Sequence, residues 1–277
     1  MPITVFAVVI SAALLHASWN AIVKSGSDKF LTTIMVTTAA AGLSAVLIPF
    51  LAAPATSSLP FAAASALLQI IYFLLLAHTY QVTDMSQAYP LMRGAAPLIV
   101  AVVSSFRVTD ALSPLAWIGV TAICAGIFSI AFSSRLGDRA GIRLALLNAF
   151  VIAGYTMTDG FGVRRSGTPA AYTLWVFLLT GVPLAIWTIT TRGSTFVPYI
   201  GRYWRLGVAG GIGTTASYGL VLWAMTLAPI AVVAALRETS ILFGTLIAGL
   251  MLRESIGLSR IIAACIIAGG AAILRLA

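Results

Sequence analysis

Four ionisable side chains lie within long apolar stretches of this sequence: Arg93, Asp159, Arg237 and Glu238. At the centre of a membrane-spanning helix such a group costs roughly 2.5–3.5 kcal/mol on insertion scales, so it usually faces a cavity or a partner. A guanidinium binds a carboxylate through two parallel hydrogen bonds, which suits Arg93 or Arg237 to an anionic ligand. The alternative is a structural network of Arg93, Arg237 and Glu238 that holds parts of the chain together.

A second group of polar and aromatic residues recurs at a spacing of four, which places its members on one face of a helix. His16 and Asn20 have this spacing, with Trp19 beside them, and Tyr155 and Asp159 repeat it. Aromatic rings could stack on a flat or methylated group, and His16 and Asp159 could exchange protons. The alternative interpretation is ordinary hydrogen bonding between helices.

Three further polar residues complete the candidate ligand-binding set: Gln87, Tyr89 and Tyr218. Gln87 and Tyr89 precede Pro90, and a proline within a helix removes one backbone hydrogen bond. Pro90 and Pro97 therefore predict a kink or hinge, either static or lining a path through the protein.

The sequence shows none of the usual catalytic patterns. We find no His, Asp or Glu cluster with metal-ligand spacing, no nucleophile elbow and no glycine-rich phosphate loop. We therefore expect no enzyme activity, no metal and no cofactor.

The composition indicates whether this chain folds in water or in a membrane. Hydrophobic residues make up 60% and charged residues 8%, whereas a soluble domain carries about 25% charged residues. The net charge of +9 is spread singly or in pairs, without the dense basic stripe that binds nucleic acid. Cys124 and Cys265 both lie in apolar runs and are interpreted as packing residues. The chain is expected to be an integral membrane protein.

Apolar runs of about 20 residues, the length that crosses a bilayer, predict ten spanning helices. They cover 3–23, 31–52, 60–80, 84–106, 114–133, 141–161, 170–190, 203–227, 230–252 and 258–276. The joints at 81–84 and 228–229 are short, and they occupy matching places in the two halves. The segment 192–205 is predicted to be a connection.

The two halves resemble each other when the first is shifted by 145 positions. Arg93 then meets Glu238, and 117–127 meets 262–272. Five helices per repeat is an odd number, so the repeats 1–135 and 140–277 would insert with opposite orientation around a central cavity. This arrangement predicts that Arg93 and Glu238 lie near the pseudo-two-fold axis, where they could form a salt bridge.

Several segments resemble the EamA branch of the drug/metabolite transporter superfamily. They are the charged junction 252–259, the glycine-rich stretch 266–274, its counterpart 125–127, and the pair Trp19-Asn20. The resemblance implies two inverted five-helix repeats around a cavity, and export or exchange of small polar metabolites. Asp110 departs from the pattern, since it lies one residue past the position that matches Glu254.

These observations predict a secondary transporter, an exporter of an amino acid or related organic anion, multi-pass in a bacterial inner membrane. We expect a monomer, with protons as the coupling ion. A flippase-like carrier of lipid-linked or amphipathic substrates is the alternative. The orientation stays open: the positive-inside rule places both termini outside the cytoplasm, whereas the family resemblance implies termini inside.

Overall fold

The computed structural model describes residues 1–83, 85–106, 111–133, 139–251 and 257–277. Side chains at 24, 25, 77, 80, 81, 85–87, 131–133 and 248–251 are not described. The described residues are helical and contain no strand. The helices are α1 (Ile3–Ser25), α2 (Lys29–Leu47), η1 (Ile48–Phe50), η2 (Thr56–Ser58), α3 (Leu59–Val82), α4 (Met85–Ser105), α5 (Pro114–Ser133), α6 (Arg139–Ser166), α7 (Pro169–Met225), α8 (Ile230–Arg237), α9 (Ser240–Met251) and α10 (Leu258–Leu276).

Helix length and hydrophobicity confirm a multi-pass membrane protein. Among the described residues, eight helical stretches are long and apolar enough to cross a bilayer, and α5 adds the shorter apolar stretch Pro114–Ile130. Large apolar side chains such as Leu67, Ile118 and Ile186 are exposed on the outside of the bundle. In water such a surface would be unfavourable, whereas hydrocarbon chains can cover it.

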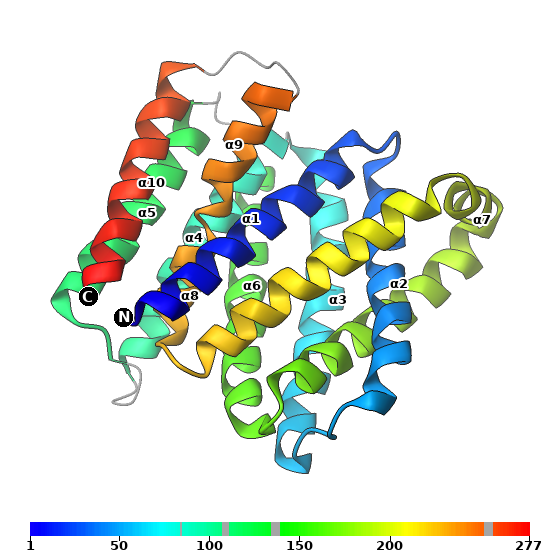
Figure 1. Ribbon diagram of the computed structural model, residues 1–277. Helices are drawn as coiled ribbons and strands as arrows, with labels where there is room; N and C mark the ends of the chain where they lie inside the picture. The colour runs from blue at the N-terminus through cyan, green and yellow to red at the C-terminus, as the bar shows by residue number, and fades with distance from the viewer. Residues whose placement is uncertain (84, 107–110, 134–138, 252–256) are drawn as a thin grey trace.

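Helices α5 and α10 lie side by side, as Figure 1 shows in green and red. Glycines permit this close approach: a Cβ at Gly270 would lie 2.9 Å from the carbonyl oxygen of Gly119. A Cβ at Gly119 would in turn lie 3.0 Å from the carbonyl oxygen of Gly270. Small residues at the contact allow two backbones to pack closely within a membrane.

Helix α7 covers the region in which two helices, 170–190 and 203–227, were predicted. It is helical over 57 residues, about 85 Å at 1.5 Å per residue, which far exceeds the roughly 30 Å of a hydrocarbon core. The predicted connection 192–205 is wrong, because only Arg192 has non-helical angles (φ −137°, ψ 24°). The chain bends there, and α2 packs against both segments of α7, through Gly181 of the first and Gly211 of the second.

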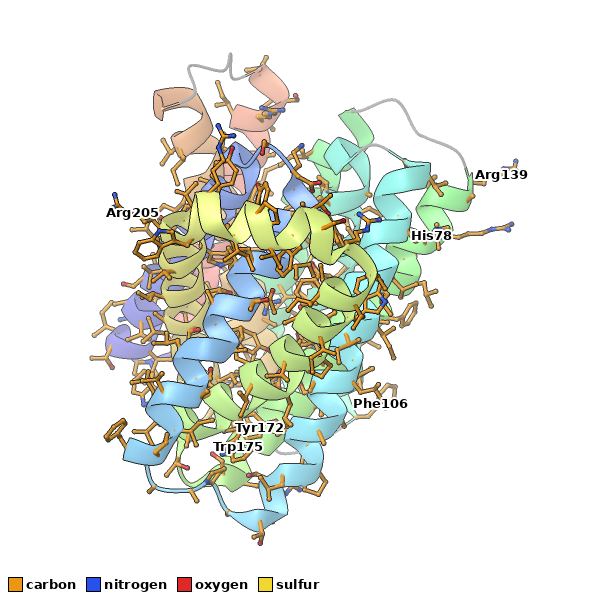
Figure 2. The ribbon with its side chains drawn as sticks, turned by 90° about the vertical axis from the view of Figure 1, so that its right-hand side faces the viewer. His78, Phe106, Arg139, Tyr172, Trp175 and Arg205 are labelled. Atoms are coloured by element: carbon orange, nitrogen blue, oxygen red, sulfur yellow. The ribbon has the colours of Figure 1, made fainter. Side chains whose placement is uncertain are left out.

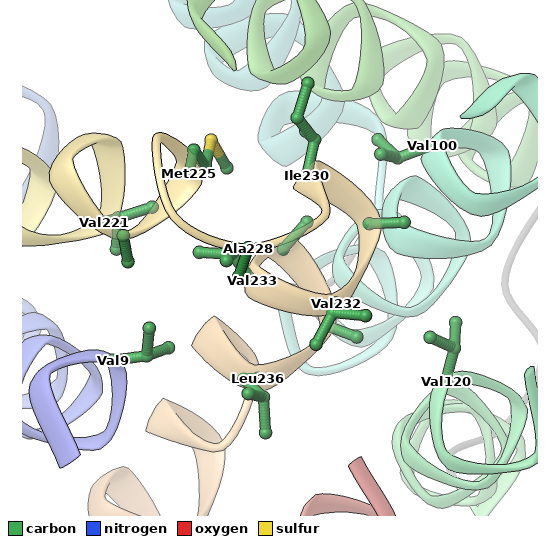
Figure 3. Close-up of a cluster of buried hydrophobic side chains, with 14 of the residues drawn as sticks. Val9, Val100, Val120, Val221, Met225, Ala228, Ile230, Val232, Val233 and Leu236 are labelled. Carbon is green, nitrogen blue, oxygen red and sulfur yellow. The ribbon is translucent and has the colours of Figure 1, made fainter. Parts of the chain in front are cut away.

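The predicted span 230–252 is interrupted in its middle. Helix α8 ends at Arg237, Glu238 follows as its C-cap, and α9 starts at Ser240. Every residue of α8 is buried. Figure 3 shows why: α8 is surrounded by apolar side chains from other helices, including Val9, Val100 and Val120. The interruption therefore lies in the core of the bundle.

The chain ends lie together, as Figure 1 shows. Nη1 of Arg275 in α10 donates to the carbonyl oxygen of Met1 at 3.0 Å. The two chain ends therefore lie on the same face of the bundle. The backbone N–H of Ala55 donates to the carbonyl oxygen of Ser166 at 2.9 Å, which joins the connections after α2 and α6. These two connections therefore lie at a common level of the bundle.

Candidate functional site

An ion pair between Arg93 of α4 and Glu238 lies inside the bundle, which confirms the predicted salt bridge. Nε of Arg93 is 2.6 Å from Oε2 of Glu238, and the two side chains are 8% and 1% exposed. The atoms meet outside the angular range of a hydrogen bond. The contact is therefore a charge pair, and the interruption after α8 brings its carboxylate to α4.

Arg237 supplies the second guanidinium of this cluster, and a carboxylate balances its charge only in part. Its Nε lies 3.6 Å from Oε1 of Glu238 and makes no aligned hydrogen bond. Within the described part of the chain, its two terminal nitrogens have no hydrogen-bond partner, and the side chain is 5% exposed.

Helix α1 contributes His16 and Trp19 to the same cluster. Nη2 of Arg93 lies 3.5 Å from Nε2 of His16, and the His16 and Trp19 rings meet edge to face at 5.2 Å. The indole N–H of Trp19 is buried and has no partner among the described residues. Asn20 is less available to bind a ligand, because its side-chain amide donates to the carbonyl oxygen of His16 at 2.8 Å.

Tyrosines from three helices surround Arg93. Its guanidinium carbon lies 5.8 Å from the centre of the Tyr89 ring, and Tyr155 of α6 meets Tyr72 of α3 with ring centres 6.0 Å apart. Tyr72 was not predicted. Its spacing of three from Gln69, within an otherwise apolar run, is the signal that could have indicated a polar face.

Asp159 of α6 lies at the centre of a separate hydrogen-bonded group. Tyr172 donates to its Oδ1 at 3.0 Å, and Tyr218 donates to its Oδ2 at 2.5 Å. Nε2 of Gln69 reaches Oδ2 at 3.5 Å and also donates to the hydroxyl of Ser65 at 3.2 Å. Figure 2 shows Tyr172 on the first segment of α7. This carboxylate joins α3, α6 and both segments of α7.

Three aromatic side chains near the ion pair and the Asp159 group are only half-buried. They are His16 of α1, Tyr72 of α3 and Tyr218 of the second segment of α7.

Some predicted positions lie outside the described residues. These are the side chain of Gln87, the junction residues 252–256 with Glu254, and Asp110. The described remainder of the predicted set divides into two groups and one further residue. The group around the ion pair consists of His16, Trp19, Tyr89, Arg93, Tyr155, Arg237 and Glu238. Tyr218 and Asp159 form the second group, and the side chain of Asn20 bonds to the backbone of its own helix.

The charges of the cluster favour an anion. Two guanidinium groups face one close carboxylate, and Asp159, which interacts with Arg237 electrostatically, already receives hydrogen bonds on both oxygens. Among the described residues, no group of three or more His, Cys, Asp or Glu could hold a metal ion.

An apolar helical bundle with several helices long enough to cross a bilayer, and with charged and aromatic side chains in its interior, is the architecture of a polytopic membrane protein. Residues 139–276 match the EamA-like transporter family, so the protein belongs to this family. The match confirms the resemblance to the EamA branch of the drug/metabolite transporter superfamily.

The fold has a counterpart among solved structures. One crystal structure of a protein superposes with a TM-score of 0.77, covers 99% of this chain and 96% of its own, and is 19% identical. At that identity the likeness describes the fold alone. No curated protein matches the chain.

Proposed function

We propose that the protein is a secondary transporter, without enzyme activity, that crosses a bacterial inner membrane ten times and works by alternating access. Helix α7 supplies two crossings because it bends at Arg192, and α8 with α9 supplies one. The contact between Arg275 and Met1 supports an even number of crossings, since both chain ends share one face.

The packing supports two inverted repeats, 1–135 and 140–277. An offset of five crossings exchanges α5 with α10, and these two helices pack on each other. The same offset relates the contact of α4 with α6 to that of α9 with α1. Arg93 and Glu238, which the offset also relates, lie in contact at 2.6 Å. Such repeats typically hold the substrate near the membrane midplane.

The substrate class is inferred from Arg237. Its two terminal nitrogens lack a hydrogen-bond partner in the described part of the chain, and its Nε lies 3.6 Å from a carboxylate that already contacts Arg93 at 2.6 Å. A guanidinium whose charge is only partly balanced in a low-dielectric site favours an anionic ligand, and its two parallel donors fit a carboxylate. We therefore assign the substrate as a small organic anion or an amino acid bound through its carboxylate. Trp19, Tyr72 and Tyr155 provide the surrounding aromatic surface.

Protons are the proposed coupling ion, and the direction of transport is export. His16 carries the proton in this proposal. Its ring lies 3.5 Å from the guanidinium of Arg93, a cation that keeps the imidazole neutral until an anion binds. An anion bound at Arg237 would attract a proton to this imidazole, which links the two binding events. The fully hydrogen-bonded Asp159 is assigned to the framework that orients the helices.

The experiment is a ligand screen followed by transport measurements. Amino acids and organic acids that bind the native state raise the melting temperature of the detergent-purified protein. Hits are then tested in proteoliposomes with the wild type, Arg237→Ala and the control Arg139→Ala, which changes an exposed cation. We expect transport to be lost only in Arg237→Ala, while this variant still shows a cooperative melting transition of the folded protein. Normal transport by this variant would overturn the proposal, and transport of lipid-linked substrates alone would indicate a flippase.

A further inference from the structure

The segment of α7 that follows Arg192 has a distinct position. We call residues 193–205 the bend helix. It is seen end-on at the right of Figure 1, and in Figure 2 it runs across the ends of α2 and α3, reaching the labelled Arg205. A spanning helix would run alongside its neighbours. The bend helix instead lies across the start of α2.

The inner face of the bend helix is anchored in the protein. Phe196 is fully buried, and Tyr199, Ile200 and Tyr203 follow it at the spacing of one helical face. They pack against Leu31 and other apolar residues at the start of α2. The hydroxyl of Tyr199 also lies 2.6 Å from that of Thr32 in α2. The segment is therefore a fixed amphipathic helix.

The outer face of the bend helix combines cations with aromatic rings. Arg202 lies over the ring of Tyr203 at 5.5 Å, and Arg205 lies over that of Trp204 at 5.6 Å. Trp204 is 53% exposed. Interfacial helices typically carry Lys and Arg on the polar face with Trp and Phe at the headgroup level.

The start of α2 extends this cationic surface. Arg192 lies over the ring of Phe30 at 5.0 Å, next to the exposed Lys29. The one carboxylate beside these cations among the described residues, Asp28, accepts the N–H of Leu31 as the cap of α2. The surface therefore carries a positive excess, with no acid on the bend helix itself.

We propose that the outer face of the bend helix and the start of α2 bind the headgroup of an anionic phospholipid. Lys29, Arg192, Arg202 and Arg205 supply the phosphate contacts, and Trp204 lies among the headgroups. This surface is separate from the interior cluster around Arg237. Because α2 packs against both segments of α7, a lipid bound here holds the bend relative to α2.

The test uses the full-length protein in neutral detergent, titrated with phosphatidylglycerol or phosphatidylcholine and read by native mass spectrometry. The wild type is expected to bind phosphatidylglycerol preferentially. The variant Arg192→Gln/Arg202→Gln/Arg205→Gln should lose roughly 100-fold in affinity, since each cation near an anionic lipid surface contributes about fivefold. The double variant Arg139→Gln/Arg143→Gln removes exposed cations outside the bend helix and should keep the preference.

Three results would overturn the proposal. They are equal binding of the two lipids by the wild type, an equal loss in the control double variant, and displacement of phosphatidylglycerol by inorganic phosphate alone. The last result would indicate a free-anion site. Melting temperatures monitor folding, and Arg202→Gln/Arg205→Gln replaces the triple variant if Arg192→Gln unfolds the bend. Its expected loss is roughly 25-fold by the same reasoning.

Discussion

The carboxylate of Glu238 lies 2.6 Å from Nε of Arg93, although 145 positions of sequence separate the two residues. One belongs to α4 and the other to the turn between α8 and α9, so the pair joins the two halves of the chain. Both side chains are almost inaccessible. A buried pair of this kind costs much when one partner is removed, and without Arg93 the carboxylate of Glu238 keeps only the more distant Arg237, at 3.6 Å.

Arg93→Met should therefore destabilise the protein by about 3–5 kcal/mol. The free energy of unfolding, measured by SDS titration in mixed micelles, checks this. The double variant Arg93→Met/Glu238→Met removes both charges but leaves the buried Arg237 without its close carboxylate, so it should recover only part of the loss. A double variant as unstable as Arg93→Met would show that the methionine side chain, and not the unpaired charge, is responsible.

Arg237→Lys should separate charge from geometry at the proposed anion site. Lysine keeps the positive charge but loses the two parallel donors of the guanidinium. We expect KM in proteoliposomes to rise roughly tenfold, with a smaller effect on the maximal rate. An unchanged KM would indicate that Arg237 does not contact the substrate.

Tyr172→Phe should weaken the group around Asp159. It removes the hydroxyl that donates to Oδ1 at 3.0 Å, and a hydrogen bond to a charged group is worth about 1.5–3 kcal/mol. The loss should vanish when Asp159 is already alanine, which a double-mutant cycle measures. Tyr203→Phe is the control, since its hydroxyl has no hydrogen-bond partner within the described residues; a loss of equal size there would contradict the assignment.

Gly270→Ala should destabilise the contact of α5 with α10, because the added Cβ would lie 2.9 Å from a backbone oxygen of Gly119 that cannot move away. The neighbouring Gly269 has nothing within 4 Å of its added Cβ. Gly269→Ala should therefore stabilise the protein, by about 0.5–1 kcal/mol from helix propensity. Melting temperatures in detergent distinguish the pair, and equal shifts would refute the packing argument.

The ion pair could be predicted from the sequence because it follows from an alignment of the two halves of the chain. A shift of 145 positions aligned Arg93 with Glu238, and inverted repeats place related residues near one axis. The same reasoning missed Tyr72 and Tyr172, whose partners lie on other helices. In membrane spans that are apolar all round, periodicity does not reveal which face of a helix points inward. The rotation of each helix is set by packing, and packing is a property of the whole bundle.

The connection predicted at 192–205 was wrong for a related reason. Its glycines, serine and arginines are typical of a loop, yet Phe196, Tyr199 and Tyr203 share a helical face that α2 covers. A helix of this kind is stabilised by the surface on which it lies, so its local residues alone favour the wrong answer.

The sequence by itself determined the solvent and the approximate spans, because a bilayer imposes a length and a hydrophobicity on every crossing. It also identified the charged residues for which burial requires a partner. Only the tertiary structure decided that Glu238 lies in a break between two helices, that Asp159 receives hydrogen bonds from two tyrosine hydroxyls, and that Arg237 shares the carboxylate of Glu238 with Arg93. These outcomes depend on distances between segments remote in the chain, which no local pattern of residues encodes.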